Sequence, residues 1–140
     1  MSKKSSQIAA LIESFRGRGL DAHYLGYFAC FNAELFYEAH DVLEEMWLPA
    51  RRIPDGDFFK GLIQLAGAFV HLQKNRLRPA VALFKLAQAN LKKYPDRHWQ
   101  LDVGAVLAVI EDWLIRLEEN DFTVNPLTPE SAPKLRMPEA

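Results

Sequence analysis

Residues 58–74 constrain the fold most strongly, because apolar side chains cover nearly every side of this segment when it is drawn as a helix. Two apolar sides are formed by Phe58, Leu62, Leu65, Phe69 and Leu72, and by Phe59, Ile63, Ala66 and Val70. A helix that is apolar on most sides is normally surrounded by the rest of its domain. We therefore expect this segment to be the central helix of a helical bundle.

Apolar residues at helical spacing predict five more helices, and Gly and Pro residues separate them. The expected ranges are about 5–15, 22–31, 35–48, 79–94 and 96–119. Asp21 is expected to cap the second helix, Pro49 to stop the third and Pro79 to occupy the first position of the fifth. No segment alternates with a period of two residues, so we expect no strands. The predicted fold is all-α, with about six helices stacked as antiparallel hairpins and no sheet.

The length and composition indicate one folded domain. The chain has 140 residues, of which 49% are hydrophobic, and this is enough for a hydrophobic core. We expect a single helical domain over residues 1–120. Residues 121–140 contain four prolines and few large apolar side chains, which predicts an extended or mobile tail.

Charge and hydropathy argue against several classes of partner. Seventeen basic residues nearly balance eighteen acidic ones, for a net charge of −1, so we expect no nucleic-acid binding. No apolar run approaches the length of a bilayer span, and the polar N-terminus lacks an apolar signal core. A cytoplasmic protein without a membrane partner is the expected class. The single cysteine, Cys30, lies between Ala29 and Phe31 and is expected to be a buried, inert thiol.

A group of polar residues interrupts the apolar faces of two neighbouring predicted helices. On residues 35–48, His40 falls within the apolar face and Glu44 lies one turn further, at its edge, with Trp47 nearby. On residues 58–74, the only polar stripe contains Lys60, Gln64 and His71. Burying a polar group without a partner costs about 1–3 kcal/mol. We therefore expect the two polar groups to face each other.

The same residues resemble a known family. The segments Phe31-Asn32, Glu38-Ala39-His40, Leu43-Glu44 and Trp47, followed by Gly61-Leu62-Ile63-Gln64 and His71, are similar to the signature of domain-of-unknown-function family 309 (DUF309). The resemblance covers about residues 20–94. It implies a small all-helical fold found in bacterial and archaeal proteins, and it implies no activity.

Three interpretations of the polar cluster remain open. In the first, it is a structural network in which His40 bonds to Glu44 or Gln64 and the indole N–H of Trp47 is satisfied. In the second, His40, Glu44 and His71 bind a divalent metal ion, since His and carboxylate ligands suit zinc, iron or manganese. In the third, it is a metal-free hydrolytic or small-ligand pocket, in which Lys60 or Arg51 meets an anion.

The expected function follows from these interpretations. The first favours a non-enzymatic binding or scaffold module, and this module could be a homodimer. The alternative is a metal-dependent enzyme that uses two histidines and one carboxylate.

Overall fold

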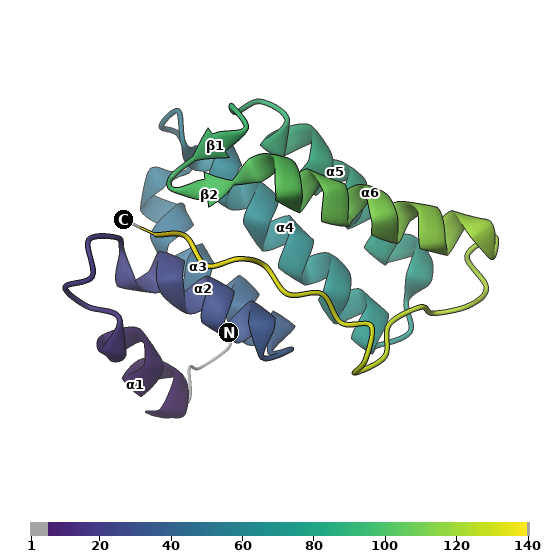
Figure 1. The fold of residues 1–140 in the computed structure, drawn as a ribbon, viewed down its shortest axis with the longest axis horizontal. Coiled ribbons are helices and arrows are strands. Elements are labelled where there is room, and N and C mark those ends of the chain that lie inside the picture. The colour runs from purple at the N-terminus through teal and green to yellow at the C-terminus, as the bar shows by residue number, and fades with distance from the viewer. Residues whose placement is uncertain (1–5, 140) are drawn as a thin grey trace.

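The computed structural model describes residues 6–139 and confirms the all-α fold of stacked helices. The helices are α1 (Ser6–Ser14), α2 (Ala22–Asn32), α3 (Phe36–Ala50), α4 (Gly56–Gln73), α5 (Leu77–Leu91) and α6 (Val103–Glu119). Short loops join α3 to α4 and α4 to α5, so these three helices lie side by side as antiparallel hairpins (Figure 1).

Helix α4 is the centre of the fold, as the sequence predicted. The ring of Phe69 packs 5.5 Å from that of Phe31 on α2 and 5.0 Å from that of Trp113 on α6, measured between centroids. The hydroxyl of Tyr27 on α2 donates to the carbonyl of Leu62 across 2.6 Å. Helices α2 and α6 therefore cover the same side of α4, and this side carries the aromatic core.

Two helix boundaries differ from the sequence prediction at prolines. Helix α3 passes through Pro49 and ends at Ala50. A proline in the last turn removes only one hydrogen bond, so it does not force the helix to stop before it. Helix α5 begins two residues before Pro79. The proline still lies in the first turn, where backbone N–H groups have no intrahelical acceptor.

The expectation of no sheet and of a helix from residue 96 was wrong for one short segment. Two-residue strands β1 (Arg97–His98) and β2 (Leu101–Asp102) form an antiparallel hairpin before α6. The turn residues Trp99 and Gln100 both have positive φ, at 51° and 59°, as a tight two-residue hairpin turn requires. Tertiary contacts hold this turn: the carbonyl of Trp99 accepts from Tyr24 Oη at 2.9 Å, and its indole donates to Asp55 at 3.1 Å.

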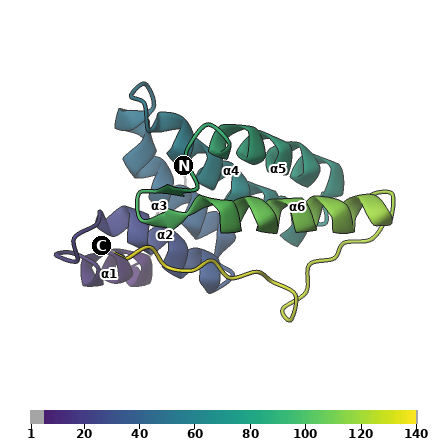
Figure 2. The ribbon, with the colours of Figure 1, turned by 45° about the horizontal axis from the view of Figure 1, so that its top comes forward.

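The C-terminal segment after α6 is extended, and it runs back across the molecule toward α2 (Figures 1 and 2). The side-chain amide of Asn32 donates to the carbonyl of Leu135 at 2.8 Å and accepts from its N–H at 2.7 Å. Leu135 is only 5% exposed. The extended path agrees with the sequence, whereas the expected mobility of the tail and the domain limit at residue 120 stay predictions.

Candidate functional site

An open groove runs along the side of α4 that faces away from the aromatic core, and α3 and α5 form its walls. Its volume is about 220 Å³. The lining residues are Tyr37 and His40 from α3, Ile63, Gln64, Gly67, Val70 and His71 from α4, and Leu83 from α5. The lining is mostly apolar, and three of the six residues of the predicted polar cluster, His40, Gln64 and His71, meet in it.

The α3 side of the groove places His40 beside an aromatic ring. The rings of Tyr37 and His40 lie nearly parallel, with an interplanar angle of 18° and centroids 6.2 Å apart. Nε2 of His40 is 3.9 Å from Oε2 of Glu44, which is too far for a hydrogen bond. Both side chains remain about one-third exposed, at 32% and 40%, so they do not form the buried hydrogen-bonded pair that the network hypothesis describes.

The α5 side of the groove holds Gln64 through a partner that the polar-cluster prediction did not include. Nδ2 of Asn90 donates to Oε1 of Gln64 at 2.7 Å. Nζ of Lys93 extends this chain by donating to Oδ1 of Asn90 at 3.2 Å and to Oδ2 of Asp57 at 2.7 Å. Gln64 therefore links α4 to α5, whereas the sequence analysis paired it with His40. Lys60 is exposed and does not line the groove.

Comparison with known families identifies the segment that contains the groove. Residues 24–83 match the family model described as Domain of unknown function (DUF309). Over these residues the chain is similar to this family. No curated protein and no solved structure matches the chain. Every residue that lines the groove lies within the DUF309 segment, while Asn90 lies just beyond it.

Three ring nitrogens of the matched segment are buried without a hydrogen-bond partner among the described residues. They are Nδ1 of His40, Nδ1 of His71 and Nε1 of Trp47. Two of the three belong to residues that line the groove. A buried polar atom without a partner costs about 1–3 kcal/mol. Both imidazoles line the groove, and no described residue holds either Nδ1 atom by a hydrogen bond.

At neutral pH the environment of His71 favours its neutral form. Burial lowers the pKa of its imidazole below the ordinary value, and the positive charges of Arg76 and Lys74 lower it further. A neutral imidazole carries one hydrogen-bond donor and one acceptor. His71 can therefore bind an uncharged polar group, such as a hydroxyl, without a proton being taken up first.

The metal hypothesis for the groove stays a prediction. Residues 6–139 contain no group of three His, Cys, Asp or Glu side chains that could hold an ion. His40 and His71 both line the groove, whereas Glu44 does not.

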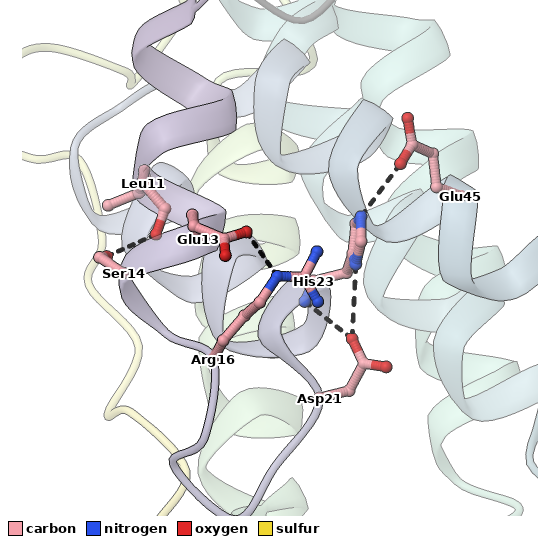
Figure 3. A network of polar contacts seen from close by, with 7 residues as sticks. All are labelled: Leu11, Glu13, Ser14, Arg16, Asp21, His23 and Glu45. Carbon is pink, nitrogen blue, oxygen red and sulfur yellow. Dashed lines mark hydrogen bonds and ion pairs between the residues drawn. The ribbon is translucent and has the colours of Figure 1, made fainter.

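The remaining titratable clusters lie outside the groove. Figure 3 shows His23 between Glu45, whose Oε2 is 3.0 Å from Nε2, and the helix-capping Asp21. His98 Nε2 lies 2.7 Å from Oδ1 of Asp55. Cys30 is buried as expected, and burial raises the pKa of its thiol to about 11. These groups have structural partners or are inaccessible, so they do not extend the site.

Five groove residues were absent from the predicted cluster; of these, Tyr37 carried a signal in the sequence and Leu83 did not. Tyr37 precedes His40 by three residues, which places both on one face of α3. Leu83 required knowledge of how α5 packs: a Cβ atom placed on Gly67 would lie 3.1 Å from Cδ1 of Leu83.

Within the described residues, no helix is both long enough and apolar enough to span a membrane.

Proposed function

We propose that this protein is a non-enzymatic binding module and that the groove over α4 is its binding site. The observation that carries the proposal is the pair of imidazoles, those of His40 and His71, that line an otherwise apolar groove. Their buried Nδ1 atoms have no partner among the described residues, whereas a structural network would have satisfied them. A cytoplasmic location and the absence of a nucleic-acid partner belong to the same proposal.

The lining defines the chemistry of the bound group. Ile63, Val70 and Leu83 offer apolar contact, and Gly67 keeps the floor of the groove low. Neither a lysine nor an arginine lines the groove, and His71 is neutral, so an anion would find no charged partner there. The group that fits is uncharged, with an apolar body and one hydroxyl or amide edge. A phenol has this chemistry.

The test uses 4-methylphenol as a probe and toluene as its matched control without the hydroxyl. Each is titrated into protein labelled at the methyl groups of Ile, Leu and Val, and chemical shifts are followed by NMR. We expect shifts confined to Ile63, Val70 and Leu83, and tighter binding of 4-methylphenol than of toluene. One hydrogen bond contributes about 0.5–1.5 kcal/mol, which corresponds to roughly a 2- to 13-fold difference in Kd.

The matched variant His71→Phe keeps an aromatic ring and removes both ring nitrogens. In this variant, we expect toluene and 4-methylphenol to bind with the same affinity. The proposal is wrong if neither probe shifts the groove methyls of the monomeric protein, or if the preference for 4-methylphenol persists in both His71→Phe and His40→Phe.

A further inference from the structure

The outer face of α3, α4 and α5 continues the groove as an exposed apolar surface. On the α3 side, Tyr37 is 47% exposed, and on the α5 side Leu86 is 51% exposed. Pro79, Ala82 and Ala89 are also exposed, and they lie with Leu86 on one side of α5. This exposed face of α5 is apolar along about three turns, whereas a solvated helix face normally carries polar residues.

Charge is segregated between the two walls of the groove. Helix α3 contains four acidic residues and no lysine or arginine, and α5 contains Arg78 and Lys85 and no acidic residue. Lys92 follows directly after α5, and the next residue, Lys93, is paired with Asp57. An apolar centre with charged edges is the usual anatomy of a protein interface. Here the α3 edge is acidic and the α5 edge is basic, so the two edges are complementary to each other.

We infer that the partner that binds this face is a second copy of the chain, in a two-fold symmetric dimer. This inference rests on the proposed function and names the occupant of the groove. Two faces can meet about a two-fold axis that is parallel to α4 or about one that crosses it. The crossing axis would place α3 of one copy on α3 of the other, so that the two acidic edges would meet. The parallel axis places α3 of each copy on α5 of the other and pairs acidic with basic edges.

The axis parallel to α4 also brings the phenol ring of Tyr37 from each copy to the groove of the other copy. A rotation about an axis parallel to α4 leaves each residue at the same height along α4. Tyr37 of the second copy therefore arrives on the α5 wall of the groove, which carries Leu83. Its ring packs against the apolar lining, and its hydroxyl lies among the polar lining residues His40, Gln64 and His71.

Sedimentation equilibrium of the full chain tests the dimer. We expect a monomer–dimer equilibrium whose Kd rises with salt, because the charged edges are exposed. Tyr37→Ala and Leu86→Glu should each raise Kd more than about tenfold, as the loss of a central interface residue usually does. The matched control is Ile115→Glu on α6, since Ile115 is 46% exposed and lies on a helix outside this face. It should leave Kd unchanged.

A charge swap tests the axis. Glu44→Lys places a positive charge opposite the basic edge of the second copy and should weaken the dimer. Adding Lys85→Glu to the same chain restores opposite charges across the interface and should return Kd toward the wild-type value. If the double variant is no tighter than Glu44→Lys alone, α3 does not face α5 of the second copy, and the inferred arrangement is overturned.

The dimer and the proposed function can fail separately. The Leu86→Glu variant changes a residue outside the groove lining, so it provides a monomer with an intact groove for the 4-methylphenol titration. A wild-type protein that stays monomeric at millimolar concentration overturns the dimer, even if this monomer binds 4-methylphenol. A monomer that does not bind 4-methylphenol overturns the proposed function.

Discussion

Nδ2 of Asn90 on α5 donates a hydrogen bond to Oε1 of Gln64 on α4 across 2.7 Å. This bond fixes the two helices against each other at one end of the groove. Since both side chains are only partly accessible, water replaces the partner incompletely when one of them is removed.

Asn90→Ala should therefore lower the free energy of unfolding by about 1 kcal/mol, the usual net contribution of a hydrogen bond. Urea denaturation at pH 7 measures this loss. Gln88→Ala on the same helix is the control, because Gln88 bonds to Glu111 at an exposed position and its loss should cost much less. Equal losses of unfolding free energy in the two variants would show that the bond between Asn90 and Gln64 contributes no more than an exposed hydrogen bond.

The imidazole of His71 should titrate below the ordinary histidine pKa of about 6.5, because burial and the nearby Arg76 and Lys74 disfavour its charged form. NMR titration of the ring C–H signals, assigned with His71→Gln, measures this pKa. Arg76→Gln removes one of the positive charges and should raise it. An unchanged pKa in Arg76→Gln would leave burial as the sole cause.

The same shift predicts a pH dependence of stability. The folded-state pKa of His71 is lower than the unfolded one, so the unfolded chain binds more protons between the two values. The stabilising contribution is complete above the unfolded pKa of about 6.5 and is lost as pH falls through the folded pKa. Chemical denaturation over this range should show a smaller loss of stability in His71→Gln than in the wild type.

Asp55 should stabilise the fold through the hairpin that precedes α6. Burial alone would raise the pKa of this carboxyl group, but the hydrogen bonds from His98 and Trp99 outweigh it, so the pKa is lowered. Asp55→Asn should cost about 1–2 kcal/mol at pH 7, since hydrogen bonds to a charged group are stronger than neutral ones. Thermal unfolding followed by circular dichroism measures the difference.

The direction in which the stabilisation by Asp55 changes with pH follows from the lowered pKa of its carboxyl group. The contribution of Asp55 is present above the unfolded pKa of about 3.9 and is lost as pH falls through the folded pKa. Asp112→Asn serves as the control, because its pair with Arg116 is an exposed pair within α6. This control should change stability by less than about 0.5 kcal/mol. A similar loss in both variants would contradict a special role for the hairpin.

Asn32 should hold the C-terminal segment on α2 through its two hydrogen bonds to Leu135. Asn32→Ala removes both bonds, so the amide of Leu135 should exchange with deuterium at least about tenfold faster if one bond contributes roughly 1 kcal/mol or more. Mass-spectrometric hydrogen exchange of peptides covering residues 128–139 measures this. Asn120→Ala, which removes only a bond to Arg116 within the end of α6, should leave the exchange rate of these peptides unchanged. Fast exchange in the wild type itself would confirm the mobility expected from the proline content.

The helical fold was largely predictable because its signals are local. The apolar faces of residues 58–74 depend only on helical periodicity, and they placed α4 at the centre correctly. The capping of α2 by Asp21 was also local, since its carboxylate accepts from the N–H of His23 two residues away. The hairpin at residues 97–102 was missed because its turn, Trp99-Gln100, has none of the residues that usually favour positive φ.

The candidate site was predictable only in part. Helical periodicity placed His40 and His71 on facing helices, and both line the groove. It could not show that Gln64 turns to Asn90, because that choice depends on how closely α5 approaches α4. The approach is close: a Cβ atom placed on Gly61 would meet the side chain of Leu91 at 2.9 Å.

The sequence by itself determined which residues form helices and which side of each helix is apolar, because both depend on interactions within a few residues of the chain. The tertiary structure alone decided which polar side chains pair, which nitrogens stay without a partner, and where a groove remains between three helices. These features depend on distances between residues that are far apart in the chain, and a periodic pattern contains no such distance.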